Sequence, residues 1–427
     1  MKSSRLDKFV KSPFRALGGL MPERGEARKL LAGTFFSALG HGLTLPFIYI
    51  YLTEVREIAG TFVGLAIGWL GLLSLFVTLI CGPLMDKLGP RRIVLPALVL
   101  EAVGVGSLAL VGNLWQAVAS LTIYGLGGIA VIKAGKATIL ASLTSSGERQ
   151  KAFGLLFALF NLGFGVGSAI AGSTVDISRP GSFQILYIVD MLCYSVPFVI
   201  LVQMPAVGQQ SPVIGKSGNG HSGYARLLRH RPFRRLIFFM LVLNFSGYAQ
   251  LEVGFTGFAA GTAGASTAVI GYAFTANTIV IVALQAFSIR KLQKCHRTHA
   301  LALASSVFAA SWITLSVAGH AGIGATVAAF AVVGFGIIFA VGEIILSPVI
   351  PALVNTLAPD NMRGRYNAVS SMTGSASSII APVITAPLLD GGFSDLWVFI
   401  VTAGCLISAL LAFSLRRHLS PEQEGMA

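Results

Sequence analysis

The feature that most constrains this chain is a succession of long apolar runs, each able to cross a lipid bilayer. A helix needs about 20 predominantly apolar residues to span the hydrocarbon core. Only helices and closed barrels can satisfy all backbone hydrogen bonds there, and runs of this length are those of helices. We therefore expect an all-α integral membrane protein with twelve transmembrane helices near residues 30–53, 61–81, 92–111, 115–141, 153–175, 183–204, 233–257, 268–289, 299–317, 323–348, 366–389 and 396–415.

Composition excludes most other classes of protein. Hydrophobic residues make up 54% of the chain and charged residues only 11%, whereas a soluble domain has about a quarter charged residues. The four cysteines show no CxxC spacing, so neither a metal site nor a disulfide framework is indicated. The chain has no HExxH, no GxSxG and no complete phosphate-binding loop. We therefore predict no enzyme, no metal and no cofactor.

The basic residues are placed asymmetrically. The net charge of +14 could suggest a nucleic-acid partner, but nearly all of the 31 Lys and Arg residues fall in alternate connections and in the two ends of the chain. The exceptions are Arg56 and Arg179, in connections on the other side, and Lys133 and Lys136, within an apolar run. Because cytoplasmic loops carry an excess of Lys and Arg, we expect both termini in the cytoplasm and no nucleic-acid partner. We expect a multi-pass protein of the bacterial inner membrane.

A polar, glycine-rich segment divides the chain into two similar halves. We assign residues 1–29 to an N-terminal arm, 30–204 to a first six-helix bundle, 205–232 to a linker, 233–415 to a second bundle and 416–427 to a tail. Gly125 and Gly127 recur at the same spacing as Gly334 and Gly336. Weak internal repeats of this kind are expected where two bundles rock about a central site.

A short charged stretch lies between the second and third apolar runs. This stretch, residues 82–92, resembles the loop between helices 2 and 3 of the major facilitator superfamily. The matching residues are Gly82, Leu84, Asp86, Gly89, Arg91 and Arg92, with Lys87 and Pro90 departing from the family pattern. The resemblance implies a twelve-helix facilitator fold, in which helices 1, 4, 7 and 10 line a central cavity. It also implies transport by alternating access.

By the same resemblance, this loop should act as a conformational latch. We expect Asp86 to face the start of helix 11 near Tyr366, where a positive helix terminus favours an acid. Arg91 or Arg92 should reach Glu148, ahead of helix 5. Both contacts would hold the cytoplasmic side closed and break when it opens.

Charged residues inside apolar runs mark the candidate cavity, because each costs about 2.5–3.5 kcal/mol in the membrane. By resemblance, the four cavity-lining helices supply His41, Lys133, Glu252 and Glu343, and Lys136 and Asn244 complete the candidates. Lys133 and Glu343 could form a pair made in one conformation and broken in another. A carboxyl group such as Glu343, able to bind and release a proton, could link proton and substrate movement.

Structural roles remain open for several of these residues. Glu101 and Lys133 lie at similar depth and could form an ion pair with no role in transport. Lys136 could extend to the membrane surface, and Glu252 could simply reach water. His41 could be a satisfied interior histidine.

Two further patterns bear on the substrate. Residues 163–172 contain Gly163, Gly165, Gly167 and Gly172, a pattern that permits close helix contact and resembles the helix-5 motif of drug:proton antiporters. Ser168 follows Gly167 where that motif has proline, and Leu121 and Tyr124 replace the Arg and Gln of the helix-4 motif.

We predict a monomeric transporter that exports an amphipathic small molecule in exchange for protons. Uptake or exchange of a small organic anion is the alternative, suggested by Lys133 and Lys136. A receptor or lipid scramblase built on the same fold is a more remote one.

Overall fold

The computed structural model describes residues 21–209, 229–292, 295–320, 322–359, 362–421 and 423–424. Within these residues there is no strand, and twelve helical segments are long and apolar enough to cross a membrane. We number these segments spans 1 to 12 in chain order. The predicted all-α class and twelve spans are thus confirmed. Residues 1–20 of the predicted arm and 210–228 of the predicted linker lie outside the described residues, so these boundaries stay predictions.

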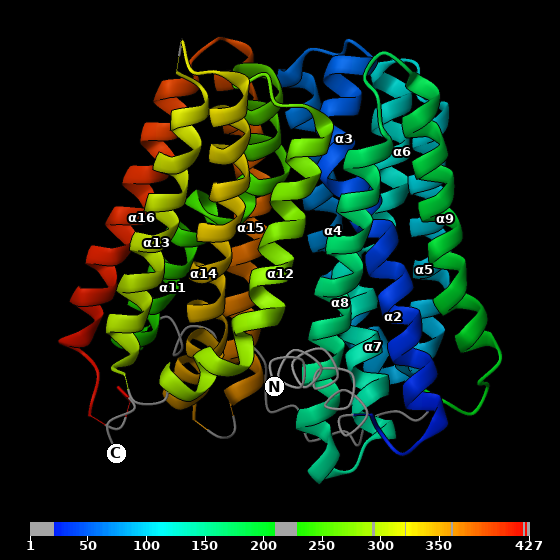
Figure 1. Ribbon diagram of the computed structural model, residues 1–427. Coiled ribbons are helices and arrows are strands. Elements are labelled where there is room, and N and C mark those ends of the chain that lie inside the picture. The colour runs from blue at the N-terminus through cyan, green and yellow to red at the C-terminus, as the bar shows by residue number, and fades with distance from the viewer. Residues whose placement is uncertain are drawn as a thin grey trace, which may run out of the picture.

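The first half of the chain forms one group of spans (blue to green in Figure 1). Span 1 combines α2 (Gly25–Thr44), η1 (Leu45–Phe47), α3 (Ile48–Ile50) and η2 (Tyr51–Val55). The following spans are built from α4 (Gly60–Leu88), α5 (Pro90–Ser107) with η3 (Leu108–Leu110), α6 (Leu114–Gly127) with α7 (Ile129–Leu143), α8 (Ser146–Thr174) and α9 (Pro180–Val202).

The second half forms a matching group beside the first (green to red in Figure 1). Span 7 begins with α11 (Arg231–Ser246) and continues irregularly through η4 (Tyr248–Gln250), η5 (Leu251–Phe255) and η6 (Phe258–Thr262). The remaining spans are α12 (Thr267–Leu292), α13 (Arg297–Ala318), α14 (Ala325–Leu357), α15 (Arg363–Asp390) and α16 (Ser394–Arg416).

Residues 82–92, predicted as a loop, are helical except at one position. The helix α4 continues to Leu88, with Pro83 inside it, and α5 begins at Pro90. Gly89 alone makes the turn, with φ of 84°, a left-handed value that glycine adopts without strain. Proline fits the first position of a helix because its missing N–H would have no helical partner there. The connection is therefore much tighter than predicted.

Spans 1, 4 and 7 are each interrupted within the span rather than at its ends. Span 1 changes to a 3₁₀ turn at Pro46, span 4 breaks at Gly128 and span 7 breaks at Gly247. Interrupted membrane helices leave backbone groups without helical partners, which is tolerated where they are buried or line a cavity. All three interruptions lie in spans that the family resemblance places around the cavity.

Two helix pairs join the bundles: α8 with α12, and α4 with α15. Small residues permit the close approach, as predicted for residues 163–172. A Cβ atom on Gly172 would lie 2.9 Å from the Cα of Gly271 on α12, and one on Gly167 would collide with the backbone of α2. The predicted role of these glycines in helix contact is confirmed.

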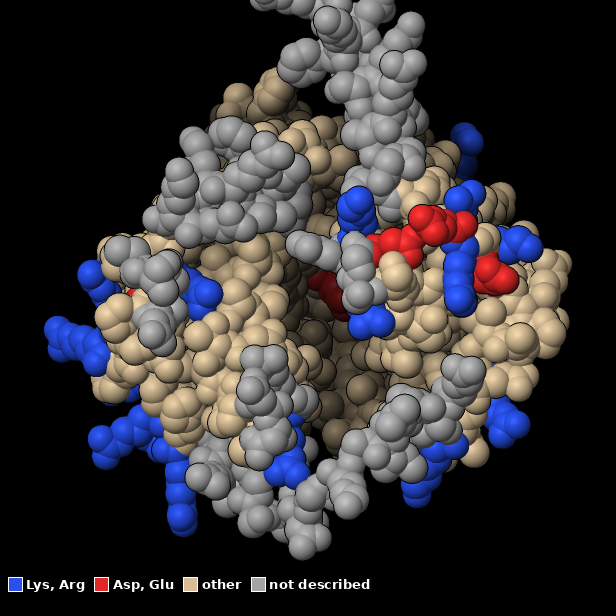
Figure 2. All heavy atoms as spheres, turned by 90° about the horizontal axis from the view of Figure 1, so that it is seen from below, with Lys and Arg blue, Asp and Glu red and all other residues tan. Residues whose placement is uncertain are grey.

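The molecule is open at one end and closed at the other. We call the end where α2 begins and α16 ends the terminal face, and the opposite end the distal face. Figure 2 views the terminal face, which is hollowed in its middle, with Lys and Arg side chains around it. At the distal face, the Asp390 carboxylate at the end of α15 accepts hydrogen bonds at the start of α4. The donors are the Gly60 and Thr61 backbone N–H groups, both at 3.3 Å, and the Thr61 hydroxyl at 3.0 Å.

Candidate functional site

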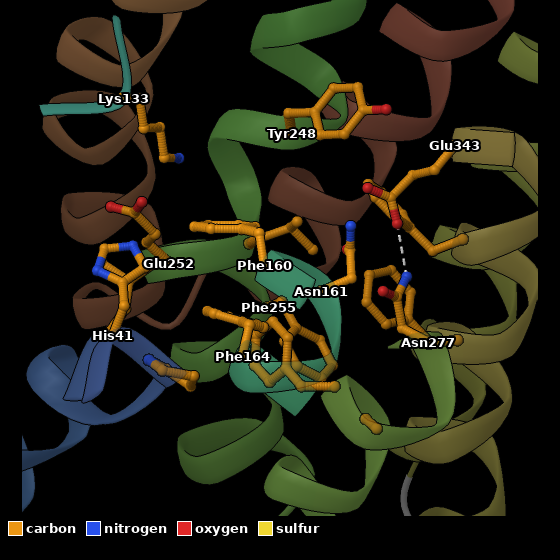
Figure 3. Close-up of a pocket in the computed structure, with 18 residues that line it drawn as sticks. His41, Lys133, Phe160, Asn161, Phe164, Tyr248, Glu252, Phe255, Asn277 and Glu343 are labelled. Carbon is orange, nitrogen blue, oxygen red and sulfur yellow. Dashed lines mark hydrogen bonds between the residues drawn. The ribbon is translucent and has the colours of Figure 1, made fainter. Parts of the chain in front are cut away.

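A cavity of about 260 Å³ lies between the bundles and is lined by spans 1, 4, 5, 7, 8 and 10. The interruption of span 1 brings Leu45 and Pro46 to its wall, and the irregular part of span 7 brings Tyr248 and Glu252. The broken helices thus place these residues at a space between the two bundles. Figure 3 shows this cavity and the residues around it.

Phenylalanine rings form much of the cavity wall. The rings pack edge to face between Phe164 and Phe274, with centroids 5.7 Å apart, and between Phe255 and Phe274, 5.3 Å apart. Phe255 also stacks on Phe335 at 4.6 Å. Six phenylalanines line the cavity: Phe160, Phe164, Phe255, Phe274, Phe335 and Phe339. Such a surface can bind apolar groups, and aromatic faces also attract cations.

Glu343 lies on one side of the cavity in a half-buried position on α14. Its Oε2 atom accepts a hydrogen bond of 2.6 Å from the Asn277 side-chain amide on α12 (dashed in Figure 3). Tyr248 lies on the same side. This donor fixes the direction of the carboxyl group while leaving it in contact with the cavity.

Lys133, Glu252 and His41 gather on the other side (Figure 3). The Lys133 ammonium lies 4.4 Å from the centre of the Phe160 ring, a cation–π contact. The Glu252 carboxyl group lies close enough to Lys133 to interact with it electrostatically. The His41 ring is buried, and its Nδ1 atom lies 3.3 Å from the Tyr124 hydroxyl.

Two side lobes extend the cavity, the larger within the first bundle and the smaller between the first bundle and Glu252, Ser375 and Ser378 of the second. One of about 400 Å³ lies among α2, α7 and α8, and the other, of about 250 Å³, lies toward α4 and α6. His41 and Lys133 border both lobes and the central cavity, so the three spaces meet at these side chains. Glu101 borders both lobes as well.

The structure places four predicted cavity residues, His41, Lys133, Glu252 and Glu343, at the central cavity. Lys136 instead borders a side lobe. It does not extend to the membrane surface, because its ammonium is buried and donates a hydrogen bond of 2.8 Å to Ser37 on α2.

Asn244 is not among the residues that line these spaces. Its amide donates to the Thr373 hydroxyl of α15 at 2.9 Å, so it joins two helices of the second bundle. The cavity assignment of Asn244 is therefore corrected to a contact between helices.

The two predicted pairings of Lys133 are not formed in this conformation. Lys133 and Glu343 lie on opposite sides of the cavity (Figure 3), and Glu343 is bonded to Asn277 instead. Glu101 and Lys133 share both side lobes, but among the described side chains no ion pair within 4.0 Å joins them. Lys133 therefore keeps its ammonium directed into the cavity.

The predicted latch residues have other partners than those expected. The Arg91 guanidinium donates to the backbone carbonyls of Leu201 and Met204 at the end of α9, the latter at 2.6 Å. Arg92 is exposed. The side chain of Asp86 lies outside the described residues, Gly82 is helical and Gly89 forms the turn.

Glu148 caps its own helix and does not meet either arginine. It forms a reciprocal capping box with Ser145 and accepts a bond from the Glu23 backbone N–H at 3.1 Å. These hydrogen bonds, the one from the Ser145 hydroxyl first, hold the pKa of the Glu148 carboxyl below its usual value. The expected contact of Arg91 or Arg92 with Glu148 is thus replaced by two separate helix caps.

Sequence reasoning missed the aromatic wall and did not single out Asn277. Phe160 and Phe164, and likewise Phe335 and Phe339, are spaced four residues apart and so share a helix face. Phe160 also adjoins Asn161, another cavity residue. That combination of an aromatic pair with a neighbouring amide was the signal available in the sequence.

Residues 30–382 match the model of the Major Facilitator Superfamily. The chain belongs to this superfamily. The MFS-type transporter YqjV of Bacillus subtilis, itself uncharacterized, is 22% identical over 91% of this chain and 93% of its own length. The quinolone resistance protein NorA of Staphylococcus aureus is 26% identical over 39% of this chain and 42% of NorA.

Solved structures support the facilitator fold. A peptide transporter of the POT family, crystallised with sulfate, superposes with a TM-score of 0.75 at 17% identity, covering 96% of this chain and 99% of that one. A D-xylose–proton symporter superposes with a TM-score of 0.71 at 13% identity, covering 93% and 98%. At such identities the likeness shows the fold alone. The family and fold are those of transporters.

Proposed function

We propose that this facilitator exports amphipathic aromatic compounds in exchange for protons. The observation that carries the proposal is the central cavity, in which six phenylalanines surround two carboxyl groups, Glu252 and Glu343. Aromatic faces and carboxylates together favour an apolar molecule that bears positive charge. The partial likeness to NorA, a quinolone resistance protein, supports the same substrate class.

We infer that the terminal face is cytoplasmic. The basic residues described at this face include Arg24, Arg28, Lys151, Arg234 and Arg417, whereas the distal connections contain Arg56 and Arg179. An excess of Lys and Arg is typical of cytoplasmic loops. The structure then represents an inward-open conformation, from which a compound can enter from the cytoplasm.

Glu343 is the proposed proton-binding residue. Proton binding removes its charge, and release restores a carboxylate that Asn277 stabilises by a hydrogen bond. Because Glu343 alternates between its protonated and ionised forms beside the substrate, the proton and the exported compound share one binding site. Exchange follows if the compound and the proton cannot both be held there.

Glu343→Gln tests this role in proteoliposomes loaded with ethidium, a fluorescent amphipathic cation. Glutamine keeps the size and the bond to Asn277 but cannot change charge. Transport driven by a pH gradient should fall at least tenfold, while exchange of ethidium across the membrane continues in part. Asn244→Asp serves as a control outside the cavity. Unchanged gradient-driven flux in Glu343→Gln would refute the assignment.

The position of Lys133 supports a second candidate, transport of a small organic anion. Its ammonium is exposed to the cavity and no carboxylate lies within 4.0 Å of it among the described side chains. If this candidate is correct, Lys133→Ala should weaken binding of an anionic compound far more than that of a neutral analogue. Equal loss for both would point to a structural role. A receptor or scramblase would show no saturable, gradient-dependent flux at all.

A further inference from the structure

Span 4, which covers Leu114–Leu143, breaks near its midpoint at Gly128. The first part, α6, ends at Gly127, and α7 begins at Ile129, with Gly128 in a left-handed conformation (φ 65°, ψ 81°). Such a break leaves carbonyl groups at the end of one helix and N–H groups at the start of the next without helical partners. The break therefore places polar backbone groups deep inside the first bundle, where the sequence predicted a continuous helix.

Glu101 of α5 packs directly against this break. A Cβ atom on Gly127 would lie only 2.4 Å from the Glu101 Cγ atom. The side chain is 1% exposed, and neither carboxyl oxygen has a hydrogen-bond partner. An ionised carboxylate that is buried without donors is among the costliest groups in a protein. This geometry favours a carboxyl group that is protonated in one state of the protein and ionised in another.

Basic groups face Glu101 from α7. Lys136 is buried and bonded to Ser37, and Lys133 borders the same lobes, yet neither forms an ion pair with Glu101 within 4.0 Å among the described side chains. Both are near enough to interact with it electrostatically. The two positive charges therefore lower the free-energy cost of ionising Glu101, although neither lysine forms a salt bridge with it.

The remaining titratable groups around Glu101 come from α2, α6, α9 and span 7, whose Glu252 borders the smaller lobe together with Glu101. The Tyr194 hydroxyl on α9 faces the Glu101 carboxyl group as a potential donor, without reaching hydrogen-bond geometry. Tyr124 on α6 contacts His41 of α2 at 3.3 Å. Asp190 on α9 accepts from Thr44. The helix α4 contributes Ser74 and Thr78 to the adjacent lobe, and neither titrates.

Protons can reach Glu101 through the side lobes. It borders both of them, and both meet the central cavity at Lys133 and His41. Asp190, although just as deeply buried, borders none of these three spaces. Of the two buried acids described in the first bundle, Glu101 is thus the one with access to the cavity.

We propose that Glu101 is a second proton-binding residue of the transport cycle. This inference rests on the proposed function and extends it: one proton site lies in each bundle, Glu343 in the second and Glu101 in the first. A hydronium ion in the water of the cavity transfers a proton to the Glu101 carboxylate: one O–H bond of hydronium breaks, the carboxyl O–H bond forms, and a water molecule is left. Its charge beside Lys136 and the break of span 4 is thereby removed, which lets α6 and α7 change their relative orientation.

Infrared titration of the purified, full-length protein tests the proton site without any substrate. The C=O stretching band of a protonated carboxylic acid disappears when the acid ionises. Wild type should lose a component of this band as pH rises, and that component should be missing in Glu101→Gln but present in Glu343→Gln and in the control Asp190→Asn. Glu101→Asp, which keeps the acid, should shift the component rather than remove it. Identical spectra of wild type and Glu101→Gln at every pH would overturn the proposal.

Transport of ethidium in proteoliposomes tests the role of this proton in the cycle. Exchange of one cation for two protons moves one net positive charge, so a membrane potential that is negative inside should accelerate export. With one proton site lost, Glu101→Gln should exchange one for one and lose this dependence on potential. An unchanged dependence in Glu101→Gln would show that its proton is not carried. If wild type fails to move ethidium, the proposed function fails, while the infrared titration still decides whether Glu101 binds a proton.

Discussion

Two buried acids of the first bundle, Asp190 and Glu101, differ in their hydrogen bonding. The Oδ2 atom of the fully buried Asp190 accepts a hydrogen bond of 2.5 Å from the Thr44 hydroxyl, whereas its Oδ1 atom and both carboxyl oxygens of Glu101 have no hydrogen-bond partner. A buried polar group that loses its partner costs about 1–3 kcal/mol. Asp190 therefore has the features of a structural contact between α2 and α9, and Glu101 those of a group that changes state.

Removing the donor to Asp190 should destabilise the protein. We expect Thr44→Val to lower the free energy of unfolding by about 1–3 kcal/mol, because it leaves a buried carboxyl oxygen unpaired. Thr34→Val is the matched control, since Thr34 is also buried on α2 but bonds only to the Leu30 carbonyl of its own helix. Thermal unfolding of the purified variants provides the measurement. Equal effects of the two substitutions would refute the structural role of Thr44.

The sequence could identify which side chains are unusual, but not always where they point. Lys133 and Glu343 stood out because charge inside a membrane is costly, and a costly group that persists has a partner or a function. Asn244 and Asn277 look alike in sequence, yet one joins two helices and the other holds Glu343. The difference depends on how each helix is rotated about its axis. The sequence does not reveal this rotation, because the lipid-facing and protein-facing sides of a membrane helix are both apolar.

Among the elements, the positions of the spans were predictable and their interruptions were not. Span length follows from bilayer thickness, but a glycine within a membrane helix can pack against a neighbour or break the helix. Gly127 packs against Glu101, while its neighbour Gly128 adopts the left-handed conformation. At Gly89 the prediction failed in the opposite direction. The charged residues predicted a loop there, but the two helices continue up to this single turn residue.

Alanine at Gly128 tests the importance of the break in span 4. A residue with a Cβ atom costs about 1–2 kcal/mol in the left-handed region, and a Cβ here would also lie 3.1 Å from Val77 Cγ1. We expect Gly128→Ala to lower the melting temperature and to impair transport. Gly154→Ala is the control: it lies within α8 with no atom within 4 Å of an added Cβ, so it should be neutral or stabilising. Normal transport by Gly128→Ala would show that the break is dispensable.

At the scale of the whole molecule, the antiparallel helices α4 and α15 join the bundles, with Gly60, Gly64, Gly68 and Gly71 of α4 packed against residues 378–390 of α15. The family resemblance predicts an acid, Asp86, at the end of α4 facing the start of α15 when the terminal face is closed. In this structure Asp390, at the end of α15, binds the start of α4 at the distal face. An acid at a helix N-terminus is stabilised by the exposed N–H groups and the helix dipole. The same helix pair therefore holds the distal face closed by the interaction that was expected at the other end.

Asp390→Asn should shift the molecule toward opening of the distal face. The amide keeps the shape but loses the charge and one acceptor, and an exposed acid at a helix terminus contributes about 0.3–1 kcal/mol. The ratio of open to closed molecules should thus rise up to about fivefold. Electron–electron distance measurements between spin labels at the exposed distal positions Leu110 and Phe393 would detect a larger population at long distance. Asp176→Asn is the control, because the Asp176 carboxylate contacts Ser178 and Arg179 within its own connection. If both variants give the wild-type distance distribution, Asp390 is a local cap of α4 and does not control which face opens.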